Sequence, residues 1–297
     1  MIRLLLLFLL LYTNAYACNW KDDVPCTVIS KTLNNSNALG DKITPTSSIT
    51  KKQIEKYNLI DLSKILNFIQ GLGVSQSGPR GQQGSVFIRG TNSNHVLVLL
   101  NGIPINDYST PTGQFDVGQD FMFNVYQIDV YKGSSGAHWG ADAVGGVINF
   151  RTNVDYNKKF SVSGNGNDKT INGNYYTRLN DFNISVSAGQ HESKNVSALS
   201  GADELDGTDN KSISVNVSKW YDLIHWRTSW FARNTFTDID GHSVAIQNDK
   251  WSDNTFYAFQ TGIDYLNNSL TLHTHDYDRD YDDAHYESDN FTIRGTH

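Results

Sequence analysis

Cysteine is scarce in this chain. Only two cysteines occur among 297 residues, Cys18 and Cys26, and both stand near the N-terminus. In an oxidising compartment two cysteines can close a small loop, but they cannot form the disulfide framework of a small secreted scaffold. The cysteines and histidines also lack the spacings typical of zinc domains. A disulfide scaffold and a zinc-finger type of domain are therefore excluded.

Long apolar segments are missing except at the N-terminus. There Arg3 precedes an apolar run from Leu4 to about Tyr12, and the small residues Ala15 and Ala17 follow. This layout is typical of a secretory signal peptide, and the run is too short for a membrane-spanning helix. We expect residues 1–17 to be removed on export. Cys18 then either pairs with Cys26 or carries a lipid, although no leucine stands three residues before it.

Positive charge is also in short supply. The formal net charge is −7, which argues against nucleic acid or anionic lipid as the main partner. Beyond the signal peptide no apolar run approaches the roughly 20 residues of a membrane helix. The remainder is rich in Asn, Ser, Gly and aromatic residues. An exported chain of this kind is either a secreted all-β protein or an outer-membrane barrel.

The first half is expected to form a small α+β domain over residues 46–153, preceded by a mobile polar leader over residues 18–45. Thr50 and Gln53 fit a capping box at the start of a helix. An apolar helical face and a glycine that ends the helix follow, formed by Leu62, Ile65, Leu66, Ile69 and Gly71. Short strands are expected over Ser85–Arg89, Val96–Leu100, Gln127–Tyr131 and Val147–Arg151.

The pattern changes after residue 153, where apolar and polar residues alternate strictly. In "FNISVSAG", for example, Phe182, Ile184 and Val186 alternate with asparagine and serines. Alternation alone also fits a soluble sandwich. Long strands, aromatic residues at strand ends, and connections that alternate short with long favour a transmembrane barrel. The long connections are expected near residues 191–211, 237–252 and 277–289.

Three glycine-containing motifs carry a resemblance to a known family. They read "IRG" at 88–90, "VLVLLNG" at 96–102 and "G…WGADA.GGVIN" from Gly133 to Asn149. In this order and spacing they resemble the plug domain of TonB-dependent outer-membrane receptors. The wording "IRGTNSNHVLVLLNG" is most similar to the cobalamin-receptor branch. The resemblance implies a small α+β plug followed by the N-terminal part of an antiparallel transmembrane β-barrel.

The resemblance also implies a function. Such a receptor takes up cobalamin or a similar bulky nutrient across the outer membrane of a Gram-negative bacterium. It contacts outer-membrane lipid, is driven by the periplasmic TonB complex, is not an enzyme, and requires no cofactor. A siderophore or haem receptor, and a non-transporting surface protein or defunct fragment, are the alternatives.

Other functions of the glycines find less support. A phosphate-binding loop needs a strand, a loop and then a helix, whereas "GPRGQQGSVFIRG" leads into a strand without Gly-Lys-Ser/Thr. No Ser/His/Asp group has the context of a catalytic triad. His95 and His138 lie in glycine-rich segments, where they are expected to serve packing and hydrogen bonding.

The energy-transducing partner of this family adds an extended receptor segment to its own sheet as a strand. The best match is Cys26–Ser30, the candidate TonB box, in which Thr27, Val28, Ile29 and Ser30 would bind the partner. Pro25 and the cysteine depart from the usual motif, so the register is open, and an irregular tail is the alternative.

Calcium is a further implication of the cobalamin-receptor resemblance, because aspartates of two successive loops bind it in that branch. Carboxylates from neighbouring loops satisfy the demand of a hard cation for oxygen ligands. The corresponding residues are Asp203, Asp206, Asp209, Asp238, Asp240 and Asp249. Neither loop fits an EF-hand, and solvated acidic loop tips are the alternative.

Two polar segments of the plug are expected to contact the ligand, as upper plug loops do in the family. The candidate ligand-binding residues are Gln76, Ser77, Arg80, Gln82, Asn106, Tyr108 and Gln114.

Residues 154–297 suffice for roughly eight strands, against about 22 in the barrels of the family. An open barrel edge is not tolerated by lipid, and the terminal aromatic residue typical of completed barrels is missing from "FTIRGTH". We therefore expect the first part of a receptor, a split gene or a remnant. A self-contained eight-stranded barrel is disfavoured because it is too narrow to hold a plug.

Overall fold

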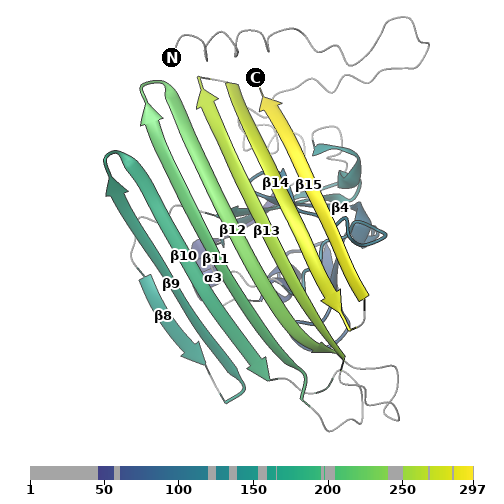
Figure 1. Cartoon of the computed structure of the whole chain (residues 1–297). Helices are drawn as coiled ribbons and strands as arrows, with labels where there is room; N and C mark the ends of the chain where they lie inside the picture. The colour runs from purple at the N-terminus through teal and green to yellow at the C-terminus, as the bar shows by residue number, and fades with distance from the viewer. Residues whose placement is uncertain are drawn as a thin grey trace, which may run out of the picture. The chain divides into compact units, whose positions relative to one another are not determined.

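The protein forms three β-sheets and two short α-helices in the part of the chain that the computed structural model describes (Figure 1). The described residues are 46–56, 61–119, 125–133, 139–152, 159–164, 166–194, 197, 205–239, 250–266, 268–282 and 284–296. The expected signal peptide, leader and TonB box lie outside them. Among these residues there is no helix long and apolar enough to cross a membrane.

Residues 46–152, which we call the plug, contain a five-stranded sheet and a separate hairpin. The sheet has the order β1-β6-β7-β4-β5, with β4 and β7 parallel. Its strands are β1 (Thr46–Thr50), β4 (Val96–Leu100), β5 (Ile103–Pro104), β6 (Val125–Lys132) and β7 (Gly146–Thr152). The hairpin joins β2 (Leu72–Gln76) to β3 (Gly84–Ile88), and the 3-10 turns are η1 (Ser93–His95) and η2 (Ala141–Ala143). The apolar run of β4 is buried, as expected for a strand inside a parallel pair.

The helical region consists of α3 (Lys51–Lys56) and α4 (Leu62–Asn67). Gln53 Oε1 accepts from the backbone N–H of Thr50 at 2.9 Å, which confirms one of the two bonds of the expected capping box. A new helix begins after Asp61, whose backbone is extended and whose carboxylate accepts from Ser63 N at 3.0 Å. Gly71 has a φ of +83°, a left-handed conformation that glycine tolerates.

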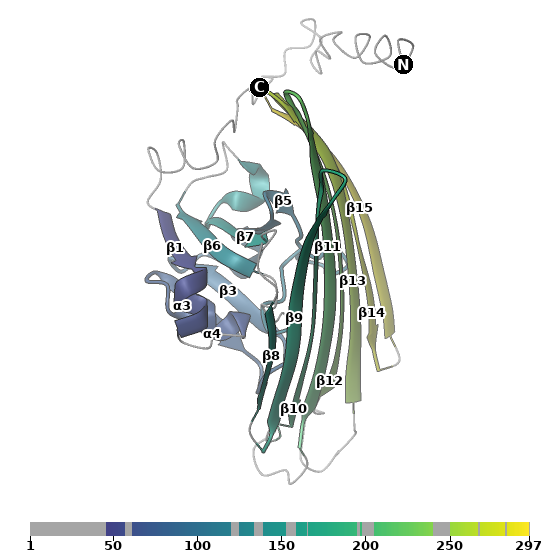
Figure 2. The same ribbon diagram turned by 90° about the vertical axis from the view of Figure 1, so that its left-hand side faces the viewer.

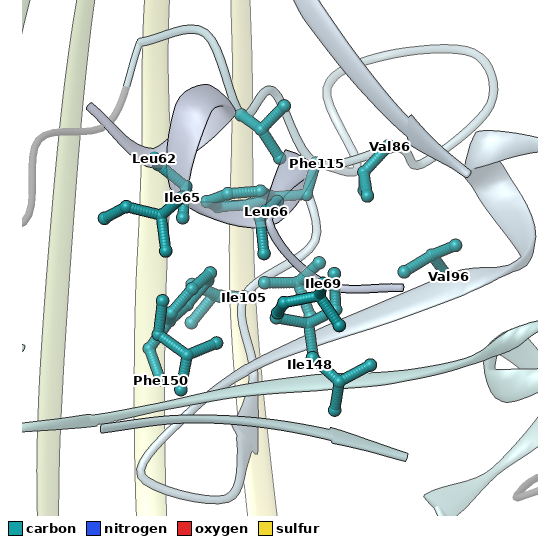
Figure 3. Packing of buried hydrophobic residues seen from close by; sticks show 14 of the residues in the cluster. Leu62, Ile65, Leu66, Ile69, Val86, Val96, Ile105, Phe115, Ile148 and Phe150 are labelled. Atoms are coloured by element: carbon teal, nitrogen blue, oxygen red, sulfur yellow. The ribbon is translucent and has the colours of Figure 1, made fainter. Parts of the chain in front are cut away.

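The plug has its own hydrophobic core, formed mainly by α4, β3, β4 and β7 (Figure 3). The four apolar residues expected on one helical face are all buried, and Ile65 and Leu66 are fully so. Figure 3 shows them packed above Ile148 and Phe150 of β7. The plug is therefore stabilised by apolar packing within itself.

Truncation of Ile65 tests this core. Ile65→Ala removes a side chain with 0% exposure and leaves a cavity, so we expect a loss of about 2–5 kcal/mol in the free energy of unfolding of the plug. Phe68→Ala is the control, because Phe68 is 66% exposed and follows the same helix. Amide hydrogen exchange of β4 and β7 measures both effects, and equal exchange rates in the two variants would contradict the packing described.

The second half of the chain forms one antiparallel sheet of eight strands, which we call the wall (Figure 1). Each strand pairs with its neighbour in sequence. The strands are β8 (Lys159–Gly164), β9 (Asp168–Leu179), β10 (Phe182–Lys194), β11 (Gly207–Tyr221), β12 (Ile224–Ile239), β13 (Lys250–Tyr265), β14 (Asn268–Tyr281) and β15 (Ala284–Thr296). The expected long connection at 277–289 is wrong, because β14 and β15 form a hairpin with only residues 282 and 283 between them. Its acidic residues alternate with other residues along the two strands.

The two faces of the wall differ in chemistry. Alternate residues of a strand point to opposite faces. One face is polar and buried, with members such as Ser185, Ser214, Asn210, Thr235, Asn254 and Thr271. The other carries exposed apolar side chains, among them Val162, Tyr175, Ile213, Trp230, Phe259 and Ile293. A polar inside and an apolar outside are the pattern of a transmembrane β-barrel.

Two glycines stand at the start of the last plug strand. Gly146 opens β7, which runs between β4 and β6 of the plug sheet. A Cβ on Gly145 would lie 2.2 Å from Thr91 Oγ1, so a larger residue there would displace the Thr91 side chain. Arg89 is exposed and has a φ of +52° in the turn after β3. Burial, and secondarily the charge of Arg89, lower the pKa of Lys132.

Candidate functional site: the contact between plug and wall

One apolar patch of the wall belongs to the core of the plug. Phe256 and Ala258 of β13 and Tyr277 of β14 are buried in the same cluster as the plug residues Ile105 and Phe115. The Tyr277 hydroxyl donates to the backbone oxygen of Ile105 at 2.8 Å. Figure 2 shows the plug elements along one face of the wall strands. The apolar patch is an exception on an otherwise polar face.

Gln119 of the plug is a centre of hydrogen bonding to the wall. Its backbone oxygen accepts from Asn210 Nδ2 at 2.9 Å and from Thr235 Oγ1 at 3.1 Å. Its side-chain oxygen accepts from Asn254 Nδ2. All three wall residues are fully buried. Three neighbouring strands, β11 to β13, therefore bind one residue of the plug.

Arg279 of β14 extends this network to a second plug residue. Its Nη2 lies 2.5 Å from Oδ2 of Asp107, a carboxylate that is 1% exposed. Its Nε donates to Asn254 Oδ1 at 3.1 Å. Asn254 thus links Arg279 to Gln119. Asp107 and Gln119 are the first and last residues of one plug loop, residues 107–119. Both ends of this loop therefore contact the wall through one continuous hydrogen-bond network.

The β2–β3 loop forms a further polar contact. Gln82 Nε2 donates to the backbone oxygen of Asp238 at 2.6 Å, and Thr237 Oγ1 donates to Gly81 O at 3.3 Å. Arg80 forms two ion pairs. Its Nε lies 3.4 Å from Oδ2 of Asp61 within the plug, and its Nη1 lies 3.1 Å from Oδ1 of Asp168, the first residue of β9. This loop therefore reaches the wall at β9 and β12.

Asp116, inside the 107–119 loop, holds the two plug loops together. Its Oδ1 accepts from Gly84 N at 2.8 Å and from Gly118 N at 2.9 Å. Burial raises the pKa of Asp116 to about 6, although these two N–H donors and the charges of Arg279 and Arg233 act in the opposite direction. The carboxyl group therefore titrates in a mildly acidic range.

This titration predicts a pH dependence of stability. Since the pKa of Asp116 is about 6 when folded and 3.8 when unfolded, its stabilising contribution is complete below pH 3.8 and lost as pH rises through 6. The contribution amounts to about 3 kcal/mol at most. Asp116→Asn should therefore reduce the change of the urea unfolding midpoint with pH between pH 4 and 7. An unchanged pH slope would contradict this assignment, and the exposed Asp181→Asn is the control.

The expected ligand-binding residues divide into two groups. Gln76, Gln82 and Asn106 use their side-chain amides inside the protein, and Asn106 bonds to the backbone of Val96, Val98 and Gly113. Ser77 and Tyr108 are exposed. In this conformation the buried amides hold the loops in place, and the exposed side chains remain accessible to a ligand.

Polar side-chain contacts hold Gln114, Arg80 and Tyr108 in place. Gln114 accepts from Ser93 Oγ at 2.7 Å, and Arg80 is ion-paired as described above. The Tyr108 hydroxyl donates to Asp142 Oδ2 at 3.2 Å. Partial burial, together with the charge of Asp142 and the hydrogen bond to it, raises the pKa of Tyr108 to about 12.

The expected calcium ligands are placed only in part. Asp203, Asp240 and Asp249 lie outside the described residues. Asp238 accepts from Gly207 N at 2.9 Å, which joins the end of β12 to the start of β11, where Asp206 is buried. Asp209 pairs with Lys211 at 2.5 Å. The structure brings the bases of the two loops together but forms no carboxylate group from Asp206, Asp209 and Asp238 in the part it describes.

Sequence comparison identifies the plug. Residues 39–147 match the family model described as "TonB-dependent Receptor Plug Domain". These residues include the first two glycine motifs, most of the third, and most of the plug sheet.

Solved structures share the fold at low sequence identity. The siderophore receptor PiuA from Acinetobacter baumannii is 20% identical with a TM-score of 0.62, over 80% of this chain and 37% of its own. The ferric yersiniabactin uptake receptor FyuA from Yersinia pestis is 15% identical with a TM-score of 0.64, over 85% of this chain and 45% of its own. The closed form of the ferric-catecholate import receptor Fiu from E. coli K12 is 15% identical with a TM-score of 0.66, over 88% of this chain and 43% of its own.

The chain thus spans less than half the length of these receptors. It has the fold of the TonB-dependent receptors, in which a plug domain is followed by antiparallel strands of a transmembrane β-barrel.

Proposed function

We propose that this chain provides the plug and part of the barrel of an outer-membrane receptor for a bulky nutrient, driven by the TonB complex. The observation that carries the proposal is the network through Arg279, Asn254 and Gln119. Hydrogen bonds between neutral groups contribute only about 0.5–1.5 kcal/mol each, net of water, and those to charged groups about 1.5–3 kcal/mol. Water can replace them when the plug shifts, whereas an extended apolar contact would resist movement.

For the ligand, we favour an iron–siderophore complex over cobalamin. The similar solved structures are named as siderophore, ferric yersiniabactin and ferric-catecholate receptors. The cobalamin hypothesis has only the wording of "IRGTNSNHVLVLLNG" in its favour. Within this proposal Ser77 and Tyr108 are the plug residues accessible to the ligand.

Energy input and calcium are parts of the same proposal. Thr27–Ser30 would add as a strand to the sheet of the TonB partner. Calcium would bind between the two loops that meet at Gly207 and Asp238. The localisation that follows is the outer membrane of a Gram-negative bacterium.

Deletion of the gene in its native bacterium tests transport and ligand together. We expect growth on ferric siderophores as the sole iron source to be lost, and cobalamin-dependent growth to be unchanged. Val28→Pro should reproduce the loss of growth while leaving siderophore binding to cells intact, because proline removes a main-chain donor that strand addition needs. Loss of cobalamin-dependent growth alone would overturn the ligand, and unchanged growth on both nutrients would favour a non-transporting surface protein.

A further inference from the structure

The outer face of the wall carries a lysine within its apolar zone. The buried Asn210 and Ser214 place the even-numbered residues of β11 on the inner face, so Lys219 lies on the outer face, two residues before the end of the strand at Tyr221. The other charged residues at the described outward positions of β9 to β14 lie toward the opposite ends of these strands. Examples are Glu192, Asp209, Lys211, Asp253 and Asp276.

Aromatic rings from three strands lie around this lysine. The strands are β10, β11 and β12, which are neighbours in the wall (Figure 1). Lys219 Nζ lies 4.4 Å from the ring centroid of Phe182 and 4.9 Å from that of Tyr221. Trp226 is directly opposite Lys219 in the register, and its ring meets that of Phe182 edge to face at 6.2 Å. Cation–π attraction therefore holds the ammonium group in place.

The ammonium group keeps hydrogen-bond donors to spare. A lysine has three donors and no acceptor. One of them donates to the backbone oxygen of Asn180, in the short turn before β10, at 3.3 Å. Arg178 and Asp181 beside this turn pair with each other, and no carboxylate of the described residues pairs with Lys219. Two donors and a positive charge therefore remain for an anion outside this part of the chain.

We propose that Lys219, held by Phe182 and Tyr221, binds the phosphate group of a phospholipid headgroup. A lysine on the lipid face of a barrel is destabilising at the midplane of the bilayer but almost neutral near the interface, where headgroups lie. The acyl chains then lie along the outward apolar residues Ile184 and Val217. The chain as a whole has a net charge of −7, so this is a local site for an anion. The inference rests on the proposed placement of the wall in the outer membrane.

Binding of brominated phosphatidylglycerol to the whole chain in neutral detergent micelles tests the site. Bromine in the acyl chains quenches the fluorescence of outer-face tryptophans such as Trp226 and Trp230. We expect Lys219→Met to weaken this binding about five-fold, the contribution of one lysine close to an anionic lipid surface. Lys211→Met is the matched control, since Lys211 lies on the same face of the same strand but pairs with Asp209 at 2.5 Å. It should leave the binding unchanged.

Two further ligands distinguish the lipid headgroup from other sources of affinity. Brominated diacylglycerol has the acyl chains without the phosphate, and it should bind equally to the unaltered chain and to Lys219→Met. Glycerol 3-phosphate has the phosphate without the chains, and it should not displace the lipid at equal concentration. Diacylglycerol that binds as tightly as phosphatidylglycerol, or displacement by glycerol 3-phosphate, overturns the proposal.

The quenching also separates this inference from the proposed function. If phosphatidylglycerol quenches the unaltered chain and Lys219→Met at the same concentrations, the headgroup site is wrong and the membrane placement of the wall stands. If it quenches neither protein, the wall does not contact lipid and both are wrong.

Acetylation of the unaltered chain avoids dependence on a variant that fails to fold. We expect phosphatidylglycerol to protect Lys219 from acetylation and to leave Lys211 as reactive as before, measured by mass spectrometry of the peptides. Equal protection of the two lysines, or protection of neither, refutes the site.

Discussion

Replacement of Arg279 by methionine is expected to weaken the docking of the plug on the wall by about 3–5 kcal/mol. The guanidinium is the ion-pair partner of Asp107 at 2.5 Å, and Asp107 is almost completely buried. Without Arg279 this carboxylate remains buried and keeps only its hydrogen bonds from Ser109, with no cationic partner among the residues described. The variant also removes a bond to Asn254, which leads on to Gln119. The loss should therefore extend to both ends of the 107–119 loop.

Urea-induced release of the plug, followed by hydrogen exchange of the 107–119 loop, measures this loss. Arg178→Met is the control, since Arg178 forms an exposed pair with Asp181 and should cost no more than about 1 kcal/mol. The double variant Asp107→Leu with Arg279→Met should recover much of the stability, because it removes the unpaired charge. If the single variant cost no more than the control, the network would not hold the loop.

Gly118→Ala is expected to destabilise the plug by about 3 kcal/mol or more. A Cβ at Gly118 would lie 1.9 Å from the backbone oxygen of Gln82 and 2.9 Å from Gly84 N. Backbone atoms cannot turn aside as a flexible side chain can. Relief of the clash must separate the two loops, which breaks the bond from Gly84 N to Asp116 and the bond from Val117 N to Gly84 O.

Gly73→Ala is the matched control, because a Cβ at Gly73 meets nothing within 4 Å. The free energy of unfolding should change by less than about 0.5 kcal/mol there. In Gly118→Ala, hydrogen exchange at Gly84 and Val117 should accelerate before that of β4. Uniform acceleration throughout the plug would show that the two loops do not form the local contact described.

Elements defined by local patterns were predictable from the sequence. The strand expected over Val96–Leu100 coincides with β4, because a buried parallel strand is apolar on both faces. The segments in which apolar and polar residues alternate form wall strands such as β11 and β12, because each wall strand has one apolar and one polar face. The hairpin of β14 and β15 was predicted as a long loop, because the aspartates near its turn, such as Asp278 and Asp280, are of a residue type common in loops.

The contact between plug and wall could not be predicted in this way. Asp107, Gln119 and Arg279 carry no local pattern, and their partners lie far away in the sequence. The expected ligand residues were chosen for polarity within a loop. Polarity alone does not distinguish an amide such as Asn106, which bonds to the protein backbone, from an exposed side chain such as Tyr108.

The long spacing of the wall contacts has a consequence for the order of folding. The core of the plug joins residues within one stretch of about one hundred, but Tyr277 contacts a residue 172 positions earlier, and Asn254 one 135 positions earlier. Contacts of such high sequence separation form slowly, because closing a long loop must precede them. The plug can pack its own core before the later strands have paired. It can be seated only after β11 to β14 have paired, so docking is a late step in the assembly of this protein.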